Sequence, residues 1–455
     1  MKQKPPLRIG EEISIKIEGL NHGGEGVGRY KGFTVFVPYA VPLDLVTARV
    51  ISLQKNYARA LLQSVSQPSY KRVSPLCQHF EKCGGCQLQH LNYAEQLKFK
   101  RDIVRNALQR IAHLDVPVLP TIGMEEPWHY RNKSQVPVGL VNNEVRIGFY
   151  EKRSHTIVDL KCCPIQHPRN DKVVNTVREA LRKNKIPLYD EKKHTGIVRH
   201  IIARTSFSNA ETLVVIVTNS RSLPYAEQLI QSLQENIPGL CGVVQNINTR
   251  RVNTIMGQEN ITLWGRSYLI ESIADLKFHI SPHSFFQVNP IQTGALYQKA
   301  KEYAGLTGSE TVFDIYCGIG TIALYLARFS KKVIGVESVE AAVKDARQNA
   351  ELNNTKNVEF FTGLAEEVVA KLIESGYQAD VVIVDPPRKG CDQKLLSAMS
   401  EMQPDRIVYI SCNPATLARD LKYLSEHGYE SMEAQPIDMF PQTSHVETVV
   451  LMSRL

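Results

Sequence analysis

Apolar and polar side chains alternate along the first 66 residues of the chain. Ile13, Ile15 and Ile17 are separated by polar residues, and the same alternation returns at Phe33–Val37 and beyond. The segment between them, NHGGEGVGRYKG, is rich in glycine and suits tight turns. A period of two bounded by turn residues is typical of strands with one buried face. We therefore predict a small antiparallel β-barrel over residues 1–66.

The middle of the chain mixes helical and strand-like patterns. Residues 93–111 carry apolar side chains at helical spacing among many lysines and arginines. Residues 127–280 alternate between the two patterns, with a helix-like stretch at Asp171–Arg182 and a strand-like run at Leu213–Thr218. No internal repeat or low-complexity tract interrupts them. We interpret residues 67–280 as a central α+β domain.

After Thr311 the pattern becomes regular: strand, glycine turn, helix, strand, helix, strand. That order predicts a parallel, doubly wound sheet of the Rossmann-like α/β class. We assign this third domain to residues 281–455. The chain length of 455 residues agrees with three domains at about 150 residues each.

Composition excludes several classes of protein. The chain is 43% hydrophobic and 22% charged, and no apolar run approaches the roughly 18 residues that a membrane span needs. The amino terminus lacks the apolar stretch of a secretory signal. We expect a soluble protein of the reducing cytoplasm with no membrane partner. The sequence leaves the oligomeric state open, with a monomer as the default.

Charge divides the chain unevenly. The net formal charge is +14 over residues 1–200, +1 over 201–300 and −7 over 301–455. A basic front half suits a polyanion such as nucleic acid, although a solubilising surface explains the charge equally well. The predicted barrel contributes a possible nucleic-acid face: Lys16, Arg29, Lys31, Arg49, Lys55 and Arg59. Its aromatic residues Phe33, Tyr39 and Tyr57 suit base stacking or the barrel core, with core favoured for Phe33.

Three cysteines form a C-x5-C-x2-C pattern at Cys77, Cys83 and Cys86. Close thiolates repel one another unless a metal neutralises them, so the spacing predicts a metal site rather than unrelated buried thiols. Zinc and an iron–sulfur cluster both accept four cysteine ligands, and both stay open. The fourth ligand must come from elsewhere: Cys162 or Cys163, with His79, His90 and His167 as weaker alternatives.

A glycine turn follows the first strand of the third domain. Gly318, Gly320 and Ala323 fit G-x-G-x-x-A, a pattern that brings backbone amides close to a ligand at a helix N-terminus. Glu337 ends the next strand, where a carboxylate accepts hydrogen bonds from ribose hydroxyls. Asp385 ends a third strand, followed by two prolines. These features fit S-adenosylmethionine or a nicotinamide cofactor, and a dehydrogenase has no obvious use for the Asp385 loop.

A fourth strand, RIVYISCNP, ends at Cys412 on the same predicted edge. The next helix begins near Ala415, and its N-terminus favours a thiolate, so we expect a low pKa for Cys412. Thiolate addition to carbon 6 of uracil makes carbon 5 nucleophilic enough to attack a sulfonium methyl group. A base must then remove the carbon 5 proton, and Glu447 on the last strand is our choice. The alternatives are a buried core cysteine and an ordinary edge-strand carboxylate.

Several motifs in this order resemble one family. DIYCGIG, VDPPRKG, SCNPATLARD and HVET are similar to motifs of the S-adenosylmethionine-dependent RNA uracil-5-methyltransferases, as is FFQVNP before the sheet. The front barrel resembles a TRAM domain, an OB-like RNA-binding module. The cysteine pattern with a distant Cys-Pro resembles the [4Fe–4S] site of the branch that acts on 23S ribosomal RNA.

The resemblance implies roles for particular residues. It implies Cys412 as the nucleophile and Glu447 as the base. Around S-adenosylmethionine and the target base it implies Gln287, Tyr316, Glu337 and Asp385. As ligands of the cluster it implies Cys77, Cys83, Cys86 and Cys163, the last chosen over Cys162 because it directly precedes Pro164. The resemblance also suggests that the helix at 93–111 packs on the catalytic domain.

The function expected from this resemblance is formation of 5-methyluridine in 23S ribosomal RNA. We expect relatives that act on transfer RNA to lack the barrel and the cluster, which favours the ribosomal substrate. The alternatives are a transfer RNA uracil methyltransferase, a non-catalytic RNA-binding assembly factor and a nicotinamide oxidoreductase.

Overall fold

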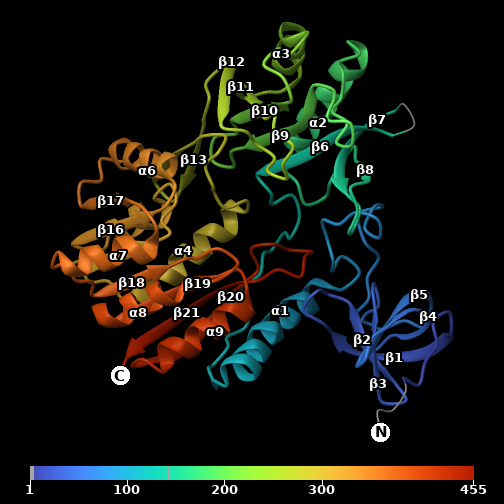
Figure 1. The fold of residues 1–455 in the computed structure, drawn as a ribbon, viewed down its shortest axis with the longest axis horizontal. Coiled ribbons are helices and arrows are strands. Elements are labelled where there is room, and N and C mark those ends of the chain that lie inside the picture. Colours follow the sequence, from blue (N-terminus) through green and yellow to red (C-terminus); the bar gives the residue numbers. More distant parts are fainter. Residues whose placement is uncertain (1–4, 142–143) are drawn as a thin grey trace.

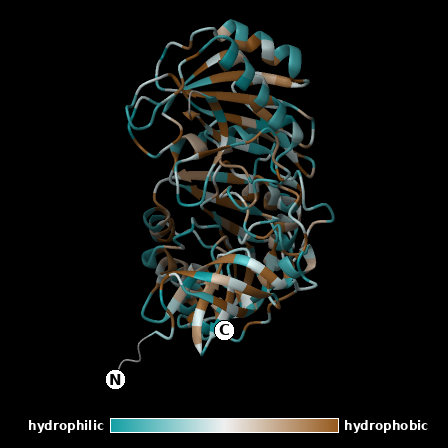
Figure 2. Cartoon of the chain, turned by 90° about the vertical axis from the view of Figure 1, so that its right-hand side faces the viewer, coloured by the Kyte–Doolittle hydropathy of each residue, from teal (hydrophilic) through white to brown (hydrophobic). Residues whose placement is uncertain are grey.

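The amino-terminal strands close into a barrel. The computed structural model describes residues 5–141 and 144–455, and its three parts are visible in Figure 1. The barrel strands follow one another in the order β1-β2-β3-β5-β4. They are β1 (Glu12–Leu20), β2 (Gly26–Tyr30), β3 (Phe33–Val37), β4 (Leu45–Leu53) and β5 (Tyr57–Gln67). Ile13, Ile15 and Ile17 point into the core as their alternation predicts, and Figure 2 shows hydrophobic and hydrophilic residues side by side along these strands.

The prediction of a purely antiparallel barrel is wrong. Strand β3 pairs with β5 in parallel, while the other neighbouring pairs are antiparallel. Five strands in a closed ring cannot alternate direction throughout, so at least one pair must be parallel. Phe33 is partly buried against the core. Tyr57 packs edge-on against Phe36, with ring centroids 5.3 Å apart.

The central part is built on a seven-stranded sheet of order β12-β11-β10-β9-β6-β7-β8. Helices α2 (Pro168–Lys183) and α3 (Ala226–Asn236) pack against one face. A hairpin of β13 (Leu269–Ile273) and β14 (Leu276–Ile280) leads to the next sheet. The strands of the central sheet are β6 (Lys133–Val141), β7 (Glu144–Tyr150), β8 (Ile157–Asp159), β9 (Val198–Thr205), β10 (Thr212–Thr218), β11 (Leu240–Ile247) and β12 (Glu259–Gly265).

The carboxyl-terminal sheet has the order β17-β16-β15-β18-β19-β21-β20. Its first five strands are parallel, as predicted, but β21 runs antiparallel to both β19 and β20. The strands are β15 (Thr311–Ile315), β16 (Lys332–Glu337), β17 (Val358–Thr362), β18 (Val381–Val384), β19 (Arg406–Ser411), β20 (Tyr429–Ile437) and β21 (Glu447–Arg454). The chain order reverses between β15 and β18, and open α/β sheets bind ligands at such a point.

Helices cover both faces of this sheet, and an apolar core lies between the helices and the sheet on each face. Helix α4 precedes β15 along the chain, and the other five helices connect successive strands from β15 to β20. They are α4 (Pro290–Ala304), α5 (Thr321–Ala327), α6 (Glu340–Leu352), α7 (Ala365–Glu374), α8 (Gln393–Met402) and α9 (Pro414–Ser425). Within residues 5–141 and 144–455, no helix is long and apolar enough to cross a membrane.

Helix α1 (Tyr93–Ala107), which continues as a π-helical turn to Ala112, packs beside α9 far along the sequence (Figure 1). Val104 and Leu108 join the core of the carboxyl-terminal sheet. The Lys100 ammonium forms a fully buried ion pair with Asp438, between β20 and β21. The front half of the chain is thereby anchored to the segment that leads into Glu447.

Candidate functional site

Five neighbouring strands bring the predicted site residues to one edge of the carboxyl-terminal sheet. In spatial order these strands are β16, β15, β18, β19 and β21. The parallel strands end at this edge, whereas antiparallel β21 begins there. The residues at these positions are Glu337, Tyr316, Asp385, Cys412 and Glu447. Positions more than 100 residues apart in sequence therefore form one row.

In the glycine turn after β15, three residues adopt left-handed backbone conformations. Tyr316, Gly318 and Gly320 have φ values of 68°, 55° and 82°. A Cβ on Gly320 would lie 3.0 Å from the Phe360 ring, so this position favours glycine for two reasons. The Glu337 carboxylate accepts the Gly318 N–H at 3.1 Å and the Val339 N–H at 2.8 Å. Glu337 thus shapes the turn itself, in addition to its predicted place beside a ribose.

Gln287 lies in the segment that joins the central part to α4. Asn132 donates its backbone N–H to the Val288 carbonyl at 2.8 Å and its side-chain amide to the Gln287 carbonyl at 3.1 Å. Asn289 caps α4 and donates its amide to the Met439 carbonyl at 3.1 Å. The FFQVNP segment is therefore fixed both to the central sheet and to the stretch between β20 and β21.

Cys412 and Glu447 stand on adjacent strands. Ser411, the residue before the thiol, pairs in register with Thr448, the residue after the carboxyl. Glu447 is buried, and burial together with the nearby Asp385 carboxyl holds its pKa well above the usual range. Burial likewise raises the pKa of Asp385 to about 7. The Arg388 guanidinium opposes these shifts at Cys412 and Glu447.

The expected low pKa of Cys412 is wrong for the free protein. Burial, and then the Glu447 and Asp385 carboxyl groups, raise the pKa of this thiol to about 11. Helix α9 does begin just after it, with Asn413 as the capping residue. The partial positive charge of that helix N-terminus is outweighed by desolvation and by two acidic neighbours. The thiol is therefore protonated at neutral pH in the free protein.

This pKa predicts how the thiol reacts with iodoacetamide. Alkylation of Cys412 should be slow at pH 7 and should rise about tenfold per pH unit between pH 8 and 10, because only the thiolate reacts. An analogue of S-adenosylmethionine that keeps a positive charge at the sulfonium position should accelerate the reaction at pH 8 by lowering the pKa of Cys412, whereas S-adenosylhomocysteine, which lacks that charge, should not. Peptide mass spectrometry reads the rate at this cysteine alone. A pH-independent rate between pH 7 and 10 would contradict the raised pKa.

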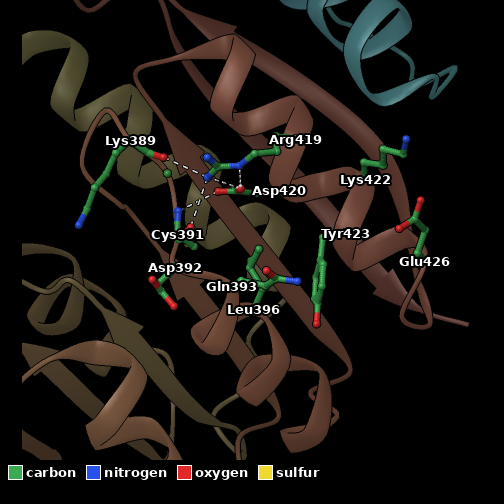
Figure 3. A pocket seen from close by; sticks show the side chains of 11 residues that line it. Lys389, Cys391, Asp392, Gln393, Leu396, Arg419, Asp420, Lys422, Tyr423 and Glu426 are labelled. Carbon is green, nitrogen blue, oxygen red and sulfur yellow. Dashed lines mark hydrogen bonds and ion pairs between the residues drawn. The ribbon is translucent and has the colours of Figure 1, made fainter.

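The loop after Asp385 is held by a hydrogen-bond network around the buried Asp420, which the sequence did not indicate (Figure 3). The Asp420 carboxylate accepts the Cys391 N–H at 2.8 Å, the Tyr409 hydroxyl at 2.6 Å and the Arg419 Nε at 2.7 Å. Arg419 also donates to the Lys389 carbonyl at 3.0 Å. The network borders a surface cavity of about 610 Å³. Its effect is to fix the loop that carries Asp385 and Arg388 relative to α9.

The cysteine pattern forms a second candidate site. A cavity of about 140 Å³ is lined by Cys77, Cys83, Cys86, Cys162 and Cys163, with the apolar side chains of Phe80, Phe149, Leu160 and Ile165. All five cysteines are free thiols. Burial raises the pKa of Cys86 to about 12 and the pKa of Cys163 as well. In the part of the chain that the structure describes, no three Cys, His, Asp or Glu side chains converge tightly enough to hold a single metal ion.

The histidines considered as ligands lie apart from this cavity. His79, His90 and His167 are not among its lining residues. His90 is buried beside the Phe80 ring, and burial lowers its pKa to about 3. Tyr39 of the barrel also packs here, with the Lys152 ammonium 4.3 Å from its ring centroid. Tyr39 thus joins the barrel to the central part and is not free to stack on a base.

Sequence reasoning missed the roles of Arg388 and Asp420. Both lie inside motifs in which another residue is the predicted site residue: Asp385 in VDPPRKG and Cys412 in SCNPATLARD. The sequence could have indicated Arg388, because it lies three positions after Asp385, just beyond the strand end that carries that carboxyl to the predicted site. Asp420 gave no such signal, because only the fold places it against Cys391 and Tyr409.

Comparison with known proteins identifies the family. Residues 92–455 match the family described as tRNA (uracil-5-)-methyltransferase, and residues 6–62 match the TRAM domain. A protein of Clostridium tetani described as an uncharacterized RNA methyltransferase is 49% identical over 100% of this chain and 98% of its own. One from Halalkalibacterium halodurans with the same description is 47% identical over 99% of both chains.

A solved structure extends the likeness to the whole chain. The tRNA (uracil-54, C5)-methyltransferase of Pyrococcus abyssi, in complex with S-adenosyl-L-homocysteine, is 30% identical with a TM-score of 0.77. The match covers 97% of this chain and 100% of that one. The expectation that relatives named for transfer RNA lack the barrel is therefore wrong. The fold, the row of residues at the sheet edge and these matches agree: this chain belongs to the S-adenosylmethionine-dependent RNA uracil-5-methyltransferase family, with an amino-terminal TRAM domain.

Proposed function

We propose that this protein makes 5-methyluridine in 23S ribosomal RNA through a transient bond between Cys412 and the target uracil. The observation that carries the proposal is the position of Cys412 and Glu447 on adjacent strands, beside Asp385 at the ligand-binding edge. We assign RNA binding to the basic barrel of residues 1–66, support of the RNA and a cluster to residues 67–280, and catalysis to residues 281–455.

The chemistry follows from the residues in this row. S-adenosylmethionine supplies an electrophilic methyl group, and its positive charge lowers the pKa values of Cys412 and Glu447 as Arg388 already does. Cys412 releases its thiol proton to solvent as its pKa falls. The thiolate then adds to carbon 6 of uracil, and the electron pair of the C5–C6 double bond moves into an enolate. Carbon 5 takes the methyl group. Glu447 then accepts the carbon 5 proton, the double bond reforms and the thiolate leaves.

The cofactor residues have distinct tasks in this proposal. The glycine turn after β15 presents backbone amides, and Glu337 both supports that turn and faces the ribose. Tyr316 and Gln287 border the donor and the target base. Asp385 lies between the donor strands and Cys412 in the sheet order. The target base must leave its stack to reach Cys412, which costs least in a loop or single strand.

We further propose that Cys77, Cys83, Cys86 and Cys163 hold a [4Fe–4S] cluster. Four thiolates are the ligand set of such a cluster, and the cysteines surround one partly apolar cavity. Cys163 is favoured over Cys162 because Cys162 is exposed at the surface. The cluster would tie the loop at residues 77–86 to the loop at 162–166, and so order the central part next to the barrel.

Two matched variants test this ligand set. In protein purified without oxygen, Cys163→Ser should lower the iron content and the visible absorbance of the cluster severalfold. Cys162→Ser should leave both close to the wild-type values, because its thiol lies outside the set. Iron and acid-labile sulfide analysis measure the content directly. Loss of iron in Cys162→Ser alone would exchange the two roles, and absence of iron from the wild-type protein would refute the cluster.

The second candidate substrate is transfer RNA. It is favoured by the likeness to the Pyrococcus abyssi enzyme, whose name states that substrate. The ribosomal substrate is favoured by the resemblance of the cysteine pattern to the 23S branch. The likeness over the whole chain means that the barrel alone does not separate the two.

One experiment decides between the substrates. Methyl-labelled S-adenosylmethionine is incubated with unmodified 23S and transfer RNA side by side, and the labelled nucleoside is identified. We expect 5-methyluridine in 23S RNA. Label only in transfer RNA would overturn the ribosomal assignment and keep the chemistry. No label in either RNA, with an assembling ribosomal particle also inactive, would support a non-catalytic assembly factor.

A further inference from the structure

A cationic cavity lies where the central sheet meets the FFQVNP segment. Its volume is about 400 Å³, and it is lined by Arg131, Lys133 and Arg204 together with Ser284, Phe285 and Phe286. Lys133 begins β6, and Arg204 lies near the end of β9. The cavity is separate from the row of residues on the catalytic sheet, and no step of the methyl transfer uses its three cations.

Two of these cations face one another on the sheet. Lys133 and Arg204 are directly opposite in the antiparallel pairing of β6 with β9. Like charges at such a position destabilise a sheet, and burial increases the cost. Arg204 is only 5% exposed. Burial, with Arg204 and Arg131 close by, lowers the pKa of Lys133 to about 7.

Within the described part of the chain, no carboxylate lies at ion-pair distance from Lys133 or Arg204. Among the described residues, no ion pair or hydrogen bond involves the Lys133 ammonium. The Arg204 guanidinium contacts the Ser284 carbonyl at 3.4 Å. Burial lowers the pKa of Arg204 to about 10, and the negative charge of Glu271 opposes this shift. Its oxygens instead accept the Ser206 hydroxyl at 3.0 Å and the Phe207 N–H at 2.9 Å.

The cavity is close to where the target base is expected. Asn132, between Arg131 and Lys133, holds the carbonyls of Gln287 and Val288. Burial, followed by the Arg388, Lys100 and Arg131 cations, lowers the pKa of His445, two residues before Glu447, to about 4. Arg131 lines the cysteine cavity too, so the negative charge of a cluster would act on it. Lys133 and Arg204 line the cationic cavity but not the cysteine cavity.

We propose that this cavity binds a phosphodiester group of the RNA strand that flanks the target uridine, with Lys133 and Arg204 as its charge partners. A phosphate bridges two opposed cations and removes their repulsion, so the cost that the pair imposes on the free protein is relieved in the complex. The proposal rests on the proposed function, because it takes RNA as the ligand. It explains why two like charges, the buried Arg204 and the half-buried Lys133, lie opposite one another beside the FFQVNP segment.

The test uses the 455-residue chain, purified without oxygen as in the cluster experiment. Lys133→Met should weaken binding of the RNA substrate about tenfold at 100 mM salt and reduce the slope of log affinity against log salt by about one. Lys133→Arg should keep both values. Affinity for S-adenosylmethionine should not change in either variant. The unfolding temperature of Lys133→Met should equal or exceed that of the wild type, because the variant removes a half-buried cation that lies opposite Arg204.

Several outcomes would overturn the proposal. Wild-type RNA affinity and salt slope in Lys133→Met would do so, as would a loss of S-adenosylmethionine affinity or of thermal stability, which would indicate a structural role. Stabilisation of the wild type by millimolar inorganic phosphate, with RNA affinity unchanged in the variant, would assign the cavity to a free anion. Lys133→Gln serves if Lys133→Met does not fold, and Lys371→Met on α7 is the control for loss of one exposed charge.

Failure of the proposed function looks different. It would appear as absent methyl transfer or absent RNA binding in the wild-type protein itself. Failure of the phosphate site would appear only in the comparison of the Lys133 variants with the wild type.

Discussion

Replacement of Cys412 by alanine is expected to lower methyl transfer to RNA by at least about 10³-fold, with S-adenosylmethionine binding unchanged. Without the sulfur, carbon 5 of uracil remains a poor nucleophile toward the methyl group. Single-turnover transfer of labelled methyl measures the rate, and calorimetry measures cofactor binding. The loss should therefore appear in the chemical step and not in the affinity for the donor.

A matched cysteine provides the control for this variant. Cys241 lies on β11 of the central sheet, where its thiol donates to the Thr212 carbonyl at 3.3 Å. Cys241→Ala removes one thiol of comparable burial and should keep activity within severalfold of the wild type. Full activity in Cys412→Ala would refute the covalent mechanism.

Replacement of Glu447 by glutamine is expected to trap the covalent intermediate. Addition of Cys412 and transfer of the methyl group can still occur, but the carbon 5 proton has no acceptor, so the thiolate cannot leave. Turnover should fall about 10²–10⁴-fold, while a protein–RNA adduct that survives denaturing gel electrophoresis accumulates. The side chains are nearly equal in size, so the buried site should keep its packing.

The trapped adduct depends on both residues. The double variant Cys412→Ala with Glu447→Gln should show no adduct, whereas Glu430→Gln on the exposed side of β20 should behave as the wild type. If Glu447→Gln retains wild-type turnover, or loses turnover with no adduct, another group removes the proton.

Much of the catalytic edge was predictable because parallel strands end on the same side of a sheet. Motif positions at strand ends were sufficient to group Glu337, Asp385 and Cys412. Glu447 was chosen on the chemistry of proton removal. The structure explains its position through the antiparallel direction of β21, whose first residue therefore lies where its neighbours end. The direction of a strand depends on how it pairs with its neighbours, and it cannot be deduced from the hydrophobic pattern of the strand itself.

The electrostatics of the site could not be predicted from local sequence. The helix N-terminus after Cys412 is a local feature, and it predicted a low pKa. The groups that reverse this prediction, Glu447 and Asp385, come from other strands. The same limit applies to Lys133 and Arg204, which are 71 positions apart in the sequence and become neighbours only through the register of β6 with β9.

The cysteine site was predictable in part from the sequence and in part only from the fold. The spacing of Cys77, Cys83 and Cys86 predicted that these three thiols share one site, and they line one cavity. The remaining wall comes from Cys162 and Cys163, whose approach depends on the packing of a distant loop. Adjacent residues on an irregular segment point in different directions, so only the fold separates the more exposed Cys162 from the more enclosed Cys163.

The covalent addition of Cys412 to uracil is tested most directly with RNA that carries 5-fluorouridine in place of uridine. Fluorine occupies the position of the proton that Glu447 removes, so elimination stops after methyl transfer. With S-adenosylmethionine present, mass spectrometry of digested protein should find a methylated fluorouracil nucleotide attached to the peptide that contains Cys412. The absence of any adduct, while the same protein methylates normal RNA, or an adduct on a different cysteine, would contradict the mechanism.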